Sequence, residues 1–296
     1  MKDIIEAAEK NQPQGAEEKQ VSERIRNIVS AIREKTAMSA YRLEIIEDSE
    51  PDIFDSKFGG VPYWDVRKDY PLDAQGRRMM LLAQINFTEA ALKDERLPQR
   101  GMLQFFIASE DDVFGMDFEQ PDSQKNFRVI FHEQIDLTVT KEQVMALDIP
   151  VSTDTDTAYS PVFVEAAVKI IETTAYMGPE DVMFDKTFRE TVKEQTGEDI
   201  GSQSCYKYLD DEEYDYLYEI LRSDGHRILG YPYFTQYDPR ESVDVYDTLL
   251  LQIDSDMRES RDYVLWGDCG VGNFFINGEA LKKKDFSKVL YNWDCC

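Results

Sequence analysis

The chain has 296 residues, of which 42% are hydrophobic and 12% aromatic, so it can bury a sizeable core in one large domain or two modest ones. Its 59 acidic residues outnumber its 33 basic residues and give a formal net charge of -26 at pH 7. A surface of that sign repels phosphate backbones and anionic membranes at long range, which argues against nucleic acid and lipid surfaces as partners.

The beginning of the chain contains no apolar run of the length that a signal peptide needs; it reads MKDIIEAAEKNQPQ. No later stretch of the sequence approaches the roughly 18 uninterrupted apolar residues of a membrane span. We therefore expect a cytoplasmic protein without a membrane partner.

Residues 1–40 are expected to form an N-terminal helical extension. Within residues 15–36, apolar side chains recur at spacings of three and four between charged ones, which predicts an amphipathic helix. We expect this helix to pack on the outside of the main body of the protein. Its apolar stripe consists of Val21, Ile25, Ile28, Val29 and Ile32.

Residues 79–87 present apolar side chains on both faces and predict a strand that is covered on both sides. Asn86, followed three residues later by Glu89, resembles a capping box, and the segment TEAALKDERL has the composition of a short helix. Pro98 ends that helix, and Gly101 opens a second strand that reads MLQFFIA.

The later half of the chain repeats these landmarks in the same order, with a short polar helical stretch expected between its two strands. The segment FGGVPYWD corresponds to ILGYPYFT, and the segment LLAQINF corresponds to LLLQIDS. Pro62 precedes Gln84 by 22 residues, and Pro232 precedes Gln252 by 20. Several landmarks in one order at matched spacing indicate an internal duplication. Because each copy is too small to be stable alone, we expect the copies to bury their apolar faces against each other.

These signals predict an α+β, β-rich fold of internally duplicated, mostly antiparallel sheets with peripheral helices and the N-terminal amphipathic helix. Residues 41–296 form a single domain in this interpretation, with repeat one at about 50–136 and repeat two at about 223–296. A helical connector covers about 137–222. The buried stripe of its last helix is predicted to be Tyr214, Leu217, Ile220 and Leu221.

The recurring residues have two interpretations that the sequence leaves open. In the first, Gly60 and Gly230 shape turns that launch strands and direct aromatic side chains into the core. The buried amides of Gln84 and Gln252 would then bind backbone groups of the other copy. In the second, the recurring residues line one ligand pocket between the copies. The candidate pocket residues are Tyr63, Trp64, Gln84, Tyr233, Gln252, Asp254, Asp268 and Asn273.

Templates for catalysis, metal binding and cofactor binding do not match the sequence. The four cysteines form neither a C-x-x-C pair nor a zinc-like Cys/His set, and no P-loop or nucleophile elbow is present. The acidic segment 110–122 is interpreted as a solvated loop, and His132 and His226 as structural side chains. We predict no catalytic residue, metal or cofactor, and favour a protein that is not an enzyme.

Six segments of the sequence closely resemble the YwqG-like family of bacterial proteins of unknown function, also called domain of unknown function 1963. The segments are GGVPYW, LLAQINF, LPQRGMLQFF, GYPYFTQ, LLLQIDSD and WGDCGVGNFFI. The resemblance runs from about residue 50 to residue 296 and implies a β-rich, internally repeated domain without an established activity or cofactor.

The resemblance also implies a class of function, because members of the family have been proposed as immunity proteins against bacterial toxins. An acidic surface agrees with such a role, since it accelerates association with a basic toxin and competes with nucleic acid for it. We therefore expect a protein-binding module with a cationic protein partner. The alternative is a small-ligand-binding or enzymatic domain that uses the candidate pocket.

Overall fold

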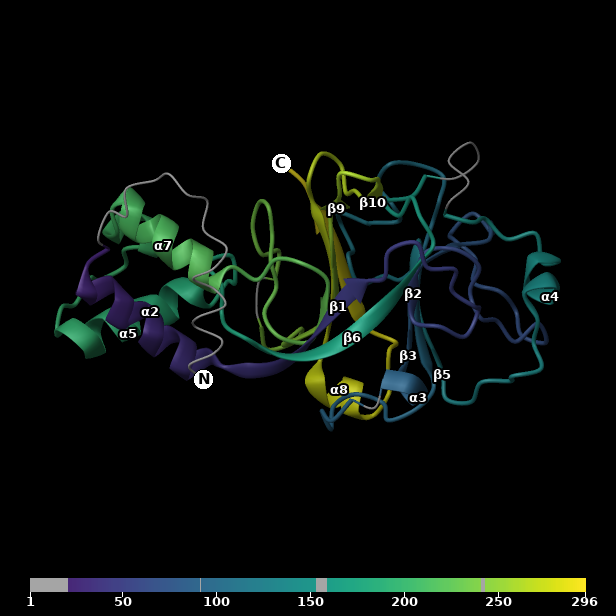
Figure 1. The fold of residues 1–296 in the computed structure, drawn as a ribbon, viewed down its shortest axis with the longest axis horizontal. Coiled ribbons are helices and arrows are strands. Elements are labelled where there is room, and N and C mark those ends of the chain that lie inside the picture. The colour runs from purple at the N-terminus through teal and green to yellow at the C-terminus, as the bar shows by residue number, and fades with distance from the viewer. Residues whose placement is uncertain (1–20, 91, 153–158, 241–242) are drawn as a thin grey trace.

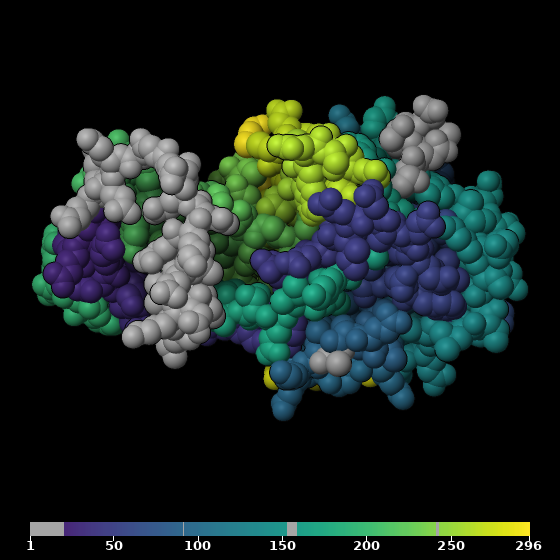
Figure 2. Space-filling model, viewed as in Figure 1, coloured from purple at the N-terminus to yellow at the C-terminus, as the bar shows by residue number. Residues whose placement is uncertain are grey.

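The structure of the chain is a computed structural model that describes residues 21–90, 92–152, 159–240 and 243–296. It consists of a large β-sheet part and a smaller unit of helices on one side of it (Figure 1). In the space-filling view, the helical unit projects from the bulk of the sheet part (Figure 2). None of the described helices is long and apolar enough to cross a membrane.

Ten strands form one sheet in which every neighbouring pair is antiparallel. This confirms the predicted β-rich, antiparallel fold. In their order across the sheet, the strands are β12 (Val289–Asp294), β11 (Val271–Ile276), β8 (Thr248–Asp254), β7 (Arg227–Ile228), β1 (Met38–Ile45), β6 (Ala166–Ala175), β2 (Lys57–Phe58), β3 (Met80–Asn86), β4 (Met102–Ile107) and β5 (Phe127–His132).

The strand order is symmetric about the β1–β6 pair, as the predicted duplication requires. The strands β2, β3, β4 and β5 of repeat one correspond to β7, β8, β11 and β12 of repeat two. The first strand of each half is exchanged, because β1 pairs with β7 of repeat two and β6 pairs with β2 of repeat one. The two exchanged strands pair along their length, from Met38 opposite Ala175 to Ile45 opposite Val168. The strand that precedes each repeat in the chain therefore joins the half of the sheet that the other repeat forms.

The main hydrophobic core lies between the two halves of the sheet. Phe105 of β4 faces Phe274 of β11 with 4.9 Å between the ring centroids. Tyr291 of β12 stacks on Phe274 at 4.5 Å, and Phe127 of β5 lies 5.2 Å from Tyr291. These rings come from both repeats, and each of the four side chains is essentially inaccessible to solvent. The apolar faces of the copies are buried against each other, as expected.

The helical unit has a core of its own, built from α2 (Glu23–Thr36), α5 (Phe184–Thr196), α6 (Cys205–Tyr208) and α7 (Asp211–Leu221). The predicted amphipathic helix is α2, and Ser22 caps it by accepting a hydrogen bond from the Ile25 amide at 3.4 Å. Its apolar stripe packs against α5 and α7 and not against the sheet. In α7, Leu217 and Leu221 are buried as predicted and Tyr214 is half-buried against the same core, whereas Ile220 is exposed.

Three short helices and a small hairpin complete the fold: α3 (Phe87–Ala90), α4 (Lys141–Met145), α8 (Gly278–Lys282), β9 (Asp256–Met257) and β10 (Asp262–Val264). The sequence predicts a polar helical stretch where β9 and β10 pair, and that prediction is wrong. Arg258 binds Asp256, its neighbour two residues away in an extended segment, and this pairing favours the hairpin. The predicted capping role of Asn86 holds, because its Oδ1 accepts from the Thr88 amide at 3.0 Å.

Candidate functional site

The repeated glycine-proline turns place two backbone segments in left-handed conformations. Gly60 has φ 72° and Gly230 has φ 83°, which a side chain would strain. A Cβ on Gly60 would lie 2.1 Å from the Glu165 carboxyl group, and a Cβ on Gly230 would lie 2.8 Å from the Cβ of Ala175. Glycine is therefore required at both positions by conformation and by space.

The amide of Gln84 is fully buried and makes three hydrogen bonds to the backbone of its own repeat. Its Oε1 accepts from the Tyr63 amide at 3.1 Å, and its Nε2 donates to the carbonyls of Ile53 at 2.8 Å and Asp55 at 2.7 Å. These bonds hold the loop of residues 53–63 against the outer face of β3. A buried amide with all these partners satisfied is a structural clamp.

Gln252 makes the same three bonds in repeat two. Its Oε1 accepts from the Tyr233 amide at 2.8 Å, and its Nε2 donates to Ser223 O at 2.8 Å and Gly225 O at 2.7 Å. The expectation that each glutamine binds the other copy is wrong, because the loop before each strand folds back onto its own repeat. The match between the two sets of bonds is the strongest structural sign of the duplication.

Of the candidate pocket residues, Tyr63, Trp64 and Gln84 are buried on the outer face of repeat one. Four strands of the sheet separate β3, which carries Gln84, from β8, which carries Gln252. The structure thus places the eight residues in two groups, one for each repeat. In repeat two, Tyr233, Gln252 and Asn273 lie together, Asp254 is half-buried and Asp268 is exposed.

Gln104 belongs to the same hydrogen-bond network as Gln84, although the sequence does not predict this role. It stands opposite Gln84 in the sheet, and its Nε2 donates to Tyr63 O at 2.7 Å. Asn273 has the same place in repeat two and donates to Tyr233 O at 2.8 Å. The signal that could have revealed Gln104 is its place in MLQFF, which matches the place of Asn273 in VGNFF.

An open groove of about 510 Å³ lies beside the end of β8 in repeat two and contains Asp254. There, His226 Nδ1 accepts from the Asp254 amide at 3.0 Å, and His226 Nε2 lies 3.4 Å from the Asp256 carboxylate. Hydrogen bonding from His226 and Arg258 lowers the pKa of Asp256, whereas burial raises the pKa of Asp254. Both nitrogens of the imidazole ring are committed to these contacts, which is typical of a structural histidine.

Residues 56–295 match the family model described as a domain of unknown function, DUF1963. The chain belongs to this family. The match confirms the resemblance inferred from the six sequence segments. It spans both copies of the glycine-proline turn and both buried glutamines, and it begins after α2 and β1. No curated protein matches the chain.

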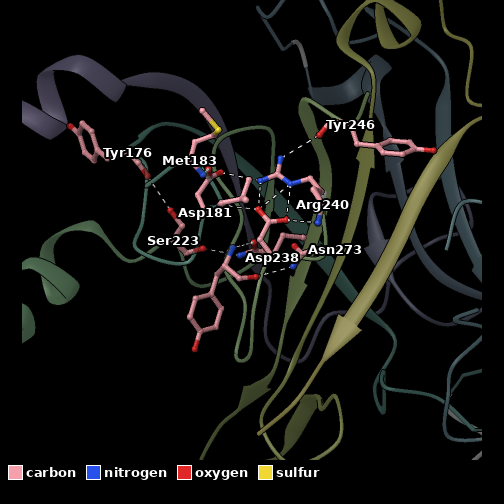
Figure 3. A network of polar contacts seen from close by, with 11 residues as sticks. Tyr176, Asp181, Met183, Ser223, Asp238, Arg240, Tyr246 and Asn273 are labelled. Carbon is pink, nitrogen blue, oxygen red and sulfur yellow. Dashed lines mark hydrogen bonds and ion pairs between the residues drawn. The ribbon is translucent and has the colours of Figure 1, made fainter. Parts of the chain in front are cut away.

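The DUF1963 region also contains a buried ionic cluster that the sequence does not reveal (Figure 3). Arg240 Nε donates to Asp238 Oδ1 at 2.9 Å, and Arg240 Nη2 donates to Asp181 Oδ2 at 3.1 Å. Burial raises the pKa of Asp181. Asp181 precedes α5, whereas Asp238 and Arg240 follow the turn of repeat two, so the cluster connects the helical unit to the sheet part.

Glu180 occupies the same junction and has an unpaired, buried Oε2. Burial raises its pKa to about 7, and the nearby hydroxyl of Tyr218 is a hydrogen-bond partner for its carboxylate. Because the pKa is raised in the folded state, protonated Glu180 favours folding at low pH. That stabilisation is lost as the pH rises from the unfolded value of 4.5 through about 7.

Replacing Glu180 by glutamine is expected to stabilise the protein at pH 8 by about 1–3 kcal/mol, because the variant keeps the shape and removes the buried negative charge. At pH 5 the two proteins are expected to unfold at similar urea concentrations. Urea unfolding at both pH values checks this result. An equal difference at pH 5 and pH 8 would contradict the assignment of the raised pKa to Glu180.

One surface of the helical unit combines exposed carboxylates with tyrosine rings, and we call it the acidic tyrosine face. Tyr206 is 68% exposed, and its ring meets that of Tyr214 edge-on at 5.4 Å. Tyr214 stacks on Tyr218 one turn further along α7, at 6.2 Å. Asp211 and Asp215 stand three residues before Tyr214 and Tyr218, and this i, i+3 spacing places their carboxylates beside the rings. The face consists of the exposed Tyr206, Asp211, Asp215 and Glu219 and the half-buried Tyr214 and Tyr218.

Proposed function

We propose that the protein is a non-catalytic, cytoplasmic protein-binding module that binds a basic protein through the acidic tyrosine face. The observation that carries the proposal is the row of tyrosine rings on α6 and α7, flanked by exposed Asp211, Asp215 and Glu219. Tyrosine provides a large and rigid contact area and is enriched at the energetic centres of protein interfaces. The carboxylates supply the charge that selects a cationic partner.

The charge of the whole molecule supports the same partner class. With a net charge of -26, the protein attracts a basic partner over long distances and accelerates the encounter. The family resemblance implies an immunity-like role, in which the partner is a basic toxin. A toxin that binds nucleic acid presents a positive surface, and an acidic module competes for that surface.

The alternative function is a small-ligand-binding or enzymatic domain with a pocket between the repeats. The groove of about 510 Å³ favours a small-ligand site, but it lies between β1 and repeat two, and of the eight candidate pocket residues Asp254 alone lines it. Its polar side chains are already engaged with one another, since Arg258 binds Asp256 at 2.7 Å and Glu47 at 2.5 Å. The acidic tyrosine face is therefore stronger evidence for protein binding than the groove is for ligand binding.

Reversing two charges on the acidic tyrosine face is the direct test. The variant Asp215→Lys with Glu219→Lys is expected to bind basic partners captured from the native cell roughly tenfold more weakly than the original protein. Binding of the original protein should also fall steeply with added salt, because exposed charges are screened. Surface plasmon resonance with the captured partner at several salt concentrations measures both effects.

The matched control reverses Glu119 and Glu259, which are exposed and lie outside the helical unit. It changes the net charge by the same amount and is expected to retain most of the affinity. If both variants lose affinity equally, the binding reflects overall charge and the acidic tyrosine face is not the interface. If the captured proteins were metabolic enzymes and included no basic protein, the result would contradict the immunity-like role.

A further inference from the structure

The two repeats each place a cationic side chain at the same position of the fold. Lys57 in β2 is fully buried, and its Nζ lies 2.6 Å from the Glu165 carboxylate. Lys57 pairs with Ala167 in the sheet, and Arg227 in β7 pairs with Arg42 in the equivalent register. Arg227 is therefore the counterpart of Lys57 in repeat two.

The carboxylate that neutralises Lys57 has no counterpart in repeat two. Glu165 stands two residues before Ala167, and Ala40 stands two residues before Arg42, so the register assigns Ala40 to the place of Glu165. Both glycine turns lie against these positions. A Cβ on Gly60 would meet Glu165, and a Cβ on Gly230 would lie 3.0 Å from the Cβ of Ala40.

Arg227 is left without the partner that its burial requires. Its Nε is buried and has no hydrogen-bond partner, and its Nη2 donates to the Asp224 carbonyl. The side chain as a whole is half-buried, and within the described part of the chain the carboxylates of Asp224 and Asp254 act on it through their charge without forming an ion pair within 4.0 Å. Burial lowers the pKa of Arg227, and this effect outweighs the opposite influence of the Asp224 and Asp254 carboxylates.

A pocket of about 130 Å³ is lined by both Ala40 and Arg227, the counterparts of Glu165 and Lys57. Two further arginines, Arg42 and Arg222, also line the pocket. Both are exposed and already form ion pairs, Arg42 with Glu44 and Arg222 with Asp224, which leaves Arg227 as the arginine available to a bound anion. The volume is well below the roughly 300–1,000 Å³ of sites for drug-sized ligands, so it suits a molecule of a few non-hydrogen atoms.

We propose that this pocket binds a small carboxylic acid as its carboxylate, which takes the place that Glu165 has in repeat one and pairs with Arg227. The planar fork of a guanidinium group matches the two oxygens of a carboxylate, and such bidentate pairs are strong when they are buried. Repeat one provides the precedent, because there the protein itself supplies a carboxylate to the buried cation. This site does not depend on the proposed protein-binding function.

The position of the pocket suggests what its occupation does. Its walls include Thr173 and Thr174 at the end of β6 and Ile220 at the end of α7. A bound carboxylate therefore contacts both the sheet part and the helical unit, and it stabilises their junction.

Calorimetric titration with acetate, succinate and inorganic phosphate at constant ionic strength tests the site. We expect succinate or acetate to bind the original protein, and phosphate to bind more weakly. Replacing Arg227 by methionine should weaken binding by at least about tenfold, because the buried cation is lost. The matched control Arg258→Met removes a guanidinium group from the neighbouring groove and should leave the affinity unchanged.

The variant Ala40→Glu reproduces repeat one within repeat two. It is expected to raise the melting temperature in the absence of ligand and to abolish carboxylate binding, because its own side chain fills the pocket. If Ala40→Glu does not fold, the Arg227→Met titration decides alone. The proposal is overturned if neither carboxylate binds, if phosphate binds best, or if Arg227→Met binds carboxylates as tightly as the original protein.

Discussion

Replacing Arg240 by leucine is expected to lower the free energy of unfolding by about 3–5 kcal/mol, because two carboxylates then remain buried without a cation. The side chains of Arg240, Asp181 and Asp238 are only 3%, 6% and 3% exposed. Arg240 also covers the ring of Phe275 at 4.5 Å, so its loss removes packing as well as charge.

The pH dependence identifies the cause of this loss. Burial already raises the pKa of Asp181 while Arg240 opposes that rise, so without Arg240 the Asp181 carboxyl group should take up a proton in the folded state at higher pH than in the unfolded chain. The damage should therefore be greatest at pH 8 and smaller at pH 5. Urea unfolding at both pH values measures it, with Arg258→Leu as the control for a partly exposed arginine. A loss below about 1 kcal/mol, or a loss independent of pH, would contradict the role of the cluster.

Replacing either Gln84 or Gln252 by leucine is expected to cost about 3–5 kcal/mol, since each change leaves two carbonyls and one amide of the backbone buried without partners. The two losses should be similar because the two sets of hydrogen bonds match. The double variant should fail to fold. Urea unfolding followed by circular dichroism gives the three values.

The control for the glutamine variants is Gln134→Leu, at an exposed position after β5. A change there should alter stability by less than about 0.5 kcal/mol. If Gln252→Leu were as stable as this control while Gln84→Leu unfolded, the two glutamines would not have equivalent roles. The matching hydrogen bonds of the two repeats would then contribute unequally to stability.

The duplication could be predicted from the sequence because its main residues have no substitutes. At Gly60 and Gly230 a side chain would be strained by the positive φ and would also collide with neighbouring atoms, and a buried side-chain amide must satisfy the same backbone groups in each copy. The exchange of β1 and β6 could not be predicted in this way. Both strands are held by backbone pairing across more than a hundred residues of sequence, and they share no distinctive side chain. Their register is visible only in the folded chain.

The candidate pocket shows a further limit of sequence comparison. Two equivalent residues, one from each copy, are related by the approximate symmetry of the fold. They can contact each other only if both lie close to the symmetry axis. Gln84 and Gln252 lie on strands that the four strands β7, β1, β6 and β2 separate, and each binds the backbone of its own repeat. The Arg227 pocket, in contrast, follows from a difference between the copies. Glu165 and Ala40 can be recognised as equivalent positions only from the strand pairing of the folded chain.

Photo-crosslinking from position 206 tests the central functional claim most directly. A benzoylphenylalanine in place of Tyr206 reports on the acidic tyrosine face, and one in place of Leu137, which is 75% exposed in the loop before α4, reports on the sheet part. The proposal predicts crosslinks from position 206 to a basic protein, none from position 137, and their loss in about 1 M salt, where charges are screened within about 3 Å. Equal crosslinking from both positions, or crosslinking from position 137 alone, would contradict it.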